Sequence, residues 1–136
     1  MPKRWTPAEV AAREGAQAFL STDVDVGQAA WEASVCKVSS QASCEVLKKS
    51  LSPMLWPSVE SKQMRRSCRA VAAKLAQDVP AGEATPRTQL WQVTLECSDQ
   101  ASGEATNGDI QVVVSEHPDG WEFERALFTQ ESQDEK

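Results

Sequence analysis

The stretch "GWEFERALFTQE" (residues 120–131) alternates polar and apolar residues, a period typical of a β-strand. Such a strand presents its apolar side chains on one face and its glutamates on the other, where we expect solvent. We expect the apolar face to cover a layer of helices, with the arginine at the rim of that face. The apolar face holds Trp121, Phe123, Arg125 and Leu127, and the solvated face holds Glu122 and Glu124.

Three further strands are predicted upstream of this one. The runs "RTQLWQVTLEC" (87–97) and "DIQVVVSE" (109–116) are rich in β-branched and aromatic residues. The run "RSCRAVAAKLAQDV" (66–79) contains much alanine, which favours a helix, but its alternation leads us to predict a strand. On this strand, one face holds Val71, Ala73 and Leu75, and the other holds Cys68, Ala70 and Lys74.

The N-terminal half is predicted to be helical and interrupted. The first helix starts with Thr6 as N-cap and Pro7 at the first helical position, as in a capping box. A second helix is predicted over residues 27–35, and a third after Ser40 or Ser43.

The order of these elements, helices first and strands last, predicts an α+β fold. N-terminal helices would pack on a curved, cone-like antiparallel sheet of three to four C-terminal strands. Pro53 and Pro57 are expected to break and restart the helical half. We predict a single domain over residues 1–131 and a polar C-terminal tail over residues 132–136.

Charge and hydropathy restrict the partners of this chain. Its net charge is −6, so its surface repels phosphate backbones, and we do not expect it to bind nucleic acid. No apolar run approaches the roughly 20 residues that cross a bilayer, and the start lacks the apolar run of a signal peptide. The chain is therefore either cytoplasmic or the extracytoplasmic part of a protein whose membrane anchor lies outside this sequence.

The four cysteines favour an oxidising compartment. None has the C-x-x-C spacing of a zinc ribbon, and a zinc site would require distant segments to converge, so we expect neither metal nor cofactor. Among three possible connectivities, we favour Cys36–Cys44 and Cys68–Cys97. The first pair requires a loop between its cysteines, and the second joins the start of one strand to the end of the next. The alternative is four free thiols buried as small hydrophobes.

The order of elements, an early "A-x-x-F-L" and a late "W-x-V…V-V-V…GW" resemble the nuclear-transport-factor-2-like, or cystatin-like, superfamily. Within it, the pattern is similar to extracytoplasmic domains of conjugation and type IV secretion assembly proteins. This resemblance implies helices on the concave side of a bent sheet. It also implies a scaffold that is tethered by an upstream membrane helix, contacts protein partners or itself, and catalyses no reaction. The four cysteines and the lack of an anchor depart from that pattern.

We therefore expect a non-enzymatic interaction or scaffold domain, and two alternatives remain open. One is a small-molecule-binding module with an apolar pocket in the open cone. Tryptophans from the helical layer, Trp31 and Trp56, would argue against that pocket by filling the mouth of the cone. The pocket would be lined by Trp91, Trp121, Phe123 and Arg125.

The second alternative is an isomerase-like or dehydratase-like enzyme, as found on this fold. It would need a buried acid with a perturbed pKa, for which Asp109 and Glu96 are the candidates. The single histidine, His117, lies in a predicted turn, and the chain contains no tyrosine. Both observations make this alternative the weaker one.

Overall fold

The computed structural model describes residues 6–100 and 103–127, so the predicted tail over residues 132–136 lies outside the described part. Helices precede strands, which confirms the predicted α+β fold. The helical elements are α1 (Ala8–Leu20), α2 (Gln28–Val38), α3 (Gln41–Val46), the π-helical turn η1 (Leu47–Leu51) and α4 (Ser52–Lys62). The strands are β1 (Arg66–Val79), β2 (Thr88–Asp99), β3 (Glu104–His117) and β4 (Gly120–Leu127).

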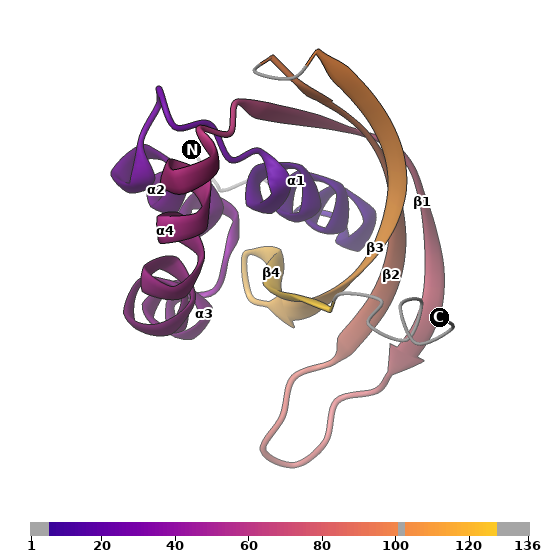
Figure 1. Cartoon of the computed structure of the whole chain (residues 1–136). Helices are drawn as coiled ribbons and strands as arrows, with labels where there is room; N and C mark the ends of the chain where they lie inside the picture. The colour runs from indigo at the N-terminus through magenta and orange to yellow at the C-terminus, as the bar shows by residue number, and fades with distance from the viewer. Residues whose placement is uncertain (1–5, 101–102, 128–136) are drawn as a thin grey trace, which may run out of the picture.

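The four strands form one antiparallel sheet in the order β1-β2-β3-β4, bent around α1 (Figure 1). Helix α1 lies on the concave side and contacts every strand. Helices α2, α3 and α4 form a second layer beyond α1. Strand β3 begins earlier and β2 ends later than predicted, so residues 98–99 and 104–108, which lie between the two predicted strands, also belong to the sheet.

A row of aromatic rings fills the interior of the cone. The ring centroids of Phe123 and Phe19 lie 6.3 Å apart, those of Phe19 and Trp31 5.8 Å, and those of Trp31 and Trp56 6.1 Å. All four side chains are buried. Trp31 and Trp56 thus occupy the interior from the helical layer, which is the arrangement that argues against a central cavity.

Gly15 lets α1 approach the aromatic row closely. A Cβ atom at this position would lie 2.3 Å from Cδ1 of Phe123 and 2.5 Å from its Cγ, well inside van der Waals contact. Alanine would gain about 1 kcal/mol of helix propensity, but overpacking a core costs about 1–3 kcal/mol.

Three side-chain atoms of Phe123 lie within 2.8 Å of that Cβ atom, so we take the upper half of the cost, about 2–3 kcal/mol. After the gain in helix propensity, we expect Gly15→Ala to lower the free energy of unfolding by about 1–2 kcal/mol, measured by urea denaturation. Gly108→Ala is the control, because a Cβ atom there meets no atom within 4 Å. A Gly15→Ala variant as stable as the wild type would contradict this close packing.

The prediction that the prolines break the helical half is wrong, because α3, η1 and α4 follow one another without a gap. Pro53 lies in the first turn of α4, directly after the wider turn of η1. At this position the missing N–H of proline costs the helix few hydrogen bonds. Pro57 lies inside α4 and removes one further helical hydrogen bond.

The predicted faces of β1 are wrong after its first bulge. The register jumps from Ala70 to Ala72, so Val71 is an extra residue in the strand. The bulge places Ala73 and Leu75 opposite residues of the concave face, on the same side as Cys68. A strand of unbroken period two would have separated them.

The structure joins Cys36 to Cys44 and Cys68 to Cys97, the pairing favoured above. Cys68 and Cys97 are directly opposite each other in the β1–β2 pair. Cys36 lies in α2 and Cys44 in α3, so the connecting loop is shorter than expected and consists of residues 39–40. Loop-closure entropy predicts that the Cys36–Cys44 bridge stabilises the fold by roughly 2–3 kcal/mol and the Cys68–Cys97 bridge, which closes a longer loop, by roughly 3–4 kcal/mol.

The predicted capping box is also wrong, because the N-cap of α1 is Pro7 and no side chain caps the helix. Thr6 instead lies beside β4, where its carbonyl oxygen accepts a hydrogen bond of 2.9 Å from the backbone N–H of Trp121. Gly120 permits this approach, since its φ is 129° and a Cβ atom would lie 2.4 Å from the nitrogen of Thr6.

Candidate functional site

A β-bulge at Glu124 determines which side chains of β4 face the core. Phe123 pairs with Val114 and Arg125 pairs with Val113, so Glu124 is the extra residue. Beyond the bulge, Ala126 packs against the core and Arg125 is exposed. The prediction that Arg125 shares a face with Phe123 is therefore wrong, because the bulge reverses the alternation.

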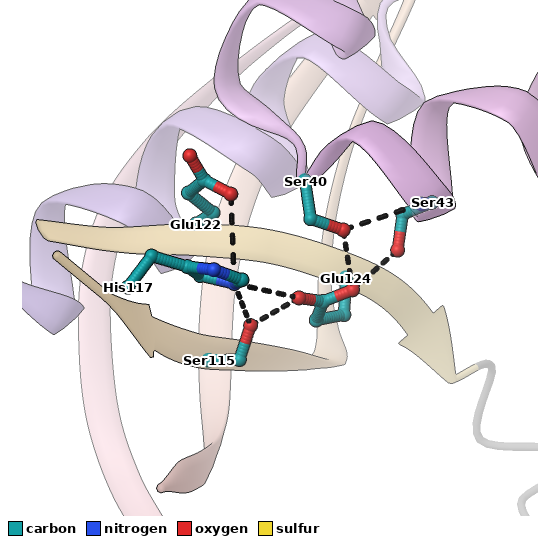
Figure 2. Close-up of polar contacts among 6 residues, drawn as sticks. All are labelled: Ser40, Ser43, Ser115, His117, Glu122 and Glu124. Atoms are coloured by element: carbon teal, nitrogen blue, oxygen red, sulfur yellow. Dashed lines mark hydrogen bonds and ion pairs between the residues drawn. The ribbon is translucent and has the colours of Figure 1, made fainter. Parts of the chain in front are cut away.

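Glu124 is the centre of a polar cluster that joins β3 and β4 to the start of α3 (Figure 2). Its side chain is only 20% exposed, so the prediction of a solvated glutamate is wrong. The hydroxyls of Ser40 and Ser43 donate to Oε1, the first at 2.7 Å, and the hydroxyl of Ser115 donates to Oε2. We call this set the Glu124 cluster; it contains Ser40, Ser43, Ser115, His117, Glu122 and Glu124.

The helical side of the cluster depends on Ser40, which is the N-cap of α3 and one of the two predicted caps. Its hydroxyl accepts a hydrogen bond of 3.2 Å from the backbone N–H of Ser43 while donating to Glu124. Its own backbone N–H donates to the carbonyl oxygen of Phe123 at 3.2 Å. Ser40 therefore bonds β4 through its backbone and its side chain, which fixes the start of α3 against the strand.

Two opposed effects act on the pKa of Glu124. Partial burial raises it, because desolvation disfavours the charged form. Hydrogen bonds from Ser115, Ser43, Ser40 and His117 lower it, because they favour the carboxylate. The hydrogen bonds prevail, and the pKa of Glu124 is lower than the ordinary value of a glutamate. Glu124 is therefore an anion at neutral pH.

His117 contacts the other residues of the cluster through one ring nitrogen, Nε2. Its Nε2 lies 2.8 Å from Oγ of Ser115, 3.4 Å from Oε2 of Glu124 and 3.5 Å from Oε1 of Glu122. Because the Ser115 hydroxyl donates to Glu124, its oxygen accepts from Nε2, which requires the proton on Nε2.

Serine, histidine and glutamate thus meet, but not as in a hydrolase. A catalytic triad uses opposite nitrogens of the ring, one for the serine and one for the carboxylate. Here both acceptors face Nε2. Ser115 is 1% exposed, so its oxygen cannot reach a substrate without a rearrangement of the cluster. The geometry suits a structural junction better than an activated nucleophile.

An apolar groove of about 420 Å³ lies next to the cluster, between the helical layer and β4. We call it the α3–β4 groove. Its walls are mainly aliphatic and aromatic. A more open cleft also borders the cluster, and Ala42, Glu124 and Arg125 line both. The groove is lined by Phe19, Val35, Ser39, Ala42, Ser43, Val46, Leu47, Ser50, Leu51, Phe123, Glu124, Arg125 and Ala126.

The structure brings only two of the four predicted pocket residues together. Phe123 and Arg125 line the α3–β4 groove. Trp121 is buried elsewhere, with the guanidinium of Arg87 5.6 Å from its ring centroid. Trp91 packs against the core from β2, and its Nε1 donates to Oε1 of Gln89 at 2.8 Å. The two tryptophans belong to the packing of the sheet and lie outside the groove.

The acids proposed for an enzyme are exposed and paired. Glu96 accepts a bond of 2.6 Å from Arg69, and Asp109 accepts bonds of 2.8 Å from Gln92 and Thr94. Neither has the burial that the prediction required, so that prediction is wrong for both. Within residues 6–100 and 103–127, no group of three or more histidine, cysteine or acidic residues is placed to hold a metal ion.

Sequence reasoning missed the Glu124 cluster, although "SSQAS" contains two of its serines. Ser40 was one of the two predicted caps, but a bulge that turns Glu124 toward that cap leaves no mark in the alternation of β4. None of the helices in the described part of the chain has the length and apolar character needed to cross a bilayer.

Comparison with known proteins gives a match in structure alone. No family model matches the chain, and no curated protein matches it. Among solved structures, a periplasmic fragment of TraM matches with a TM-score of 0.58, covering 85% of this chain and 89% of that one. Sequence identity is 10%, so the likeness concerns the fold and nothing finer. The chain thus has the α+β fold of that periplasmic fragment.

Proposed function

We propose that this chain is a non-enzymatic interaction domain of an extracytoplasmic assembly of the conjugation or type IV secretion kind. The observation that carries the proposal is a fold shared with a periplasmic fragment of TraM in a chain with two disulfides. Disulfides persist in oxidising compartments and are rare in the reducing cytoplasm. The sequence resemblance described above supports the same assignment.

The interior of the domain supports a scaffold over an enzyme. Helix α1 and the aromatic row together fill the space over the concave side of the sheet, where related folds place catalytic acids. The proposal extends to membership of the nuclear-transport-factor-2-like superfamily and to a membrane anchor outside this sequence. The partners would be other proteins of the assembly or a second copy of the chain.

The outer edge of the sheet offers a surface for such partners. The first half of β1 is covered, since Thr22, Ser21 and Gln17 accept from its backbone N–H groups. The second half carries exposed apolar side chains at Leu75 and Val79. The exposed end of an edge strand is a site at which another chain can add.

The cysteines provide the first test. Thiols in cells that make the native protein are blocked with an alkylating reagent before lysis, and the protein is then weighed with and without reduction. We expect no alkylated cysteine before reduction and four afterwards, because all four are paired. Four thiols blocked in the cell would contradict an extracytoplasmic location.

Contact with partners is tested by photo-crosslinking in the same cells. A photoreactive residue replaces Leu75 on the β1 edge, or Met54 on the opposite helical layer as the matched exposed position. We expect a discrete product from Leu75 that contains an envelope protein of the assembly or a second copy of the chain. Products with cytoplasmic enzymes only, or none from either position, would contradict the proposal.

The α3–β4 groove supports a second candidate function, a small-molecule-binding module. Its volume of about 420 Å³ falls within the roughly 300–1,000 Å³ of ligand pockets, and its walls are largely apolar with a few polar groups. This function does not require the central cavity that the aromatic row fills, and it is compatible with a scaffold role.

A further inference from the structure

We propose that the α3–β4 groove binds an aliphatic monocarboxylate, with its apolar chain against Phe123 and Leu47 and its carboxylate beside Arg125. This inference rests on the second candidate function and names the class of ligand. It moves the predicted binding site from the interior of the cone to the junction of the helical layer with β4.

The floor of the groove provides the apolar contact. Phe19, Val35, Leu47 and Phe123 each line it and are almost fully buried, so they form a rigid base that belongs to the core. A ligand chain on this base would extend the hydrophobic core without rearranging it. Transfer of methylene groups from water to such a surface is the main source of affinity for an aliphatic ligand.

The rim of the groove carries exposed apolar surface at Val46, which is 56% exposed although it lines the groove. A bound chain would cover this side chain. Ala42 and Leu51 add to the apolar lining. An occupant with an apolar body matches this lining better than a polar one.

The polar groups of the groove differ in whether they already have partners. Ser39 donates to the carbonyl oxygen of Val35 at 2.6 Å, and Ser43 donates to Glu124. Both oxygens of Glu124 accept from serine hydroxyls. These groups are engaged in the structure of the domain itself.

Arg125 is the cation of the groove that has no such engagement. Across residues 6–100 and 103–127, none of the ion pairs and hydrogen bonds includes its guanidinium. The bulge at Glu124 turns this arginine out of the core and leaves it at the edge of an apolar groove. An anionic head group next to an apolar chain is the chemistry that matches this pair of features.

Decanoate and 1-decanol are the matched probes, because they share a chain length and differ in the charge of the head group. We expect decanoate to bind the whole chain at pH 7.5 with a Kd on the order of 100 μM, as ligand efficiency suggests for a ligand of this size. Titration calorimetry below the micellar concentration gives the Kd, and NMR shifts of the methyl groups of Val46 and Leu47 locate the site.

Two exposed valines give a matched pair of variants. Val46→Asp places a charge in the groove and should weaken decanoate binding at least tenfold. Val26→Asp makes the same change at a valine that is 62% exposed and lies outside the groove, and should leave the Kd unchanged. Equal effects of the two substitutions would overturn the assignment of the site.

Arg125→Gln tests the head group separately. It should weaken decanoate about three- to fivefold, the effect of one partly exposed ion pair, and leave 1-decanol unchanged. If both probes bind and neither responds to Arg125→Gln, the groove is a ligand site but the carboxylate part of the inference is wrong. If neither probe binds the wild type, the inference and the small-molecule function both fail, while the scaffold proposal stands.

Discussion

Replacing Trp31 by alanine should lower the free energy of unfolding by about 3–5 kcal/mol, the cost of removing a large buried aromatic side chain. Trp31 is 3% exposed and lies in the middle of the aromatic row, with Phe19 on one side and Trp56 on the other. Its Nε1 also donates to the carbonyl oxygen of Phe19 at 3.1 Å. The substitution therefore opens a cavity between the two helical layers and removes a buried hydrogen bond.

Urea denaturation monitored by circular dichroism measures this effect. Trp31→Phe separates its two causes, since it keeps a ring in the row but lacks the donor, and should cost less than alanine. Met54→Ala is the control for an exposed apolar residue, because Met54 is 73% exposed and should change stability by less than about 0.5 kcal/mol. If the free energy of unfolding of Trp31→Ala lay within about 1 kcal/mol of the wild-type value, the aromatic row would not hold the two helical layers together.

The fold could be predicted because its main elements follow hydrophobic periodicity. Strands β2 and β4 alternate clearly, and helices precede strands along the chain, which predicts α+β. The second disulfide followed from the same reasoning, since the start of β1 lies opposite the end of β2 in an antiparallel pair. Each of these inferences uses a pattern that is regular over many residues.

The errors come from single residues that interrupt a regular pattern. The bulge at Val71 reverses the faces of β1, and the bulge at Glu124 moves Arg125 out of the core. Bulges depend on pairing with a neighbouring strand, which a single run of sequence does not contain. Pro53 was expected to break a helix, but a π-helical turn precedes it and the helical run continues.

The candidate site was mostly beyond prediction for the same reason. The Glu124 cluster joins residues far apart in sequence, such as Ser40 and Ser115, and it forms only because a bulge turns the glutamate toward the cap of α3. The alternation of β4 instead assigned Glu124 to solvent. Periodicity indicates which side of a strand is buried, but it does not indicate which polar groups meet across the fold.

Replacing Glu124 by glutamine should destabilise the domain by about 2–4 kcal/mol at pH 7, since hydrogen bonds to a charged group contribute more than those to a neutral one. Three serine hydroxyls donate to this carboxylate. The amide nitrogen of glutamine cannot accept such bonds, so the variant leaves at least one buried donor without its acceptor. The hydrogen bond from Ser115 should contribute most to this destabilisation, because Ser115 is buried and water cannot replace its acceptor.

The pH dependence of stability gives a second measure of the same carboxylate. The pKa of Glu124 is lowered in the folded state, so the folded protein binds its proton less tightly than the unfolded chain does. Linkage then requires that the stabilisation be complete above the unfolded pKa of about 4.3, and that it be lost as the pH falls through the lower folded pKa. The wild type should therefore lose stability in acid more steeply than the glutamine variant.

Glu122→Gln is the matched control for this measurement. Glu122 also contacts His117, at 3.5 Å, but its side chain is 37% exposed, so its removal should change stability by less than about 1 kcal/mol. Urea denaturation of the three proteins from pH 7 to pH 3 provides the comparison. The curves of wild type and Glu124→Gln should converge toward acid, because protonation of Glu124 removes the same charge as the substitution. Curves that stay parallel would place the destabilisation elsewhere and contradict a charged Glu124 as the centre of the junction between α3 and the sheet.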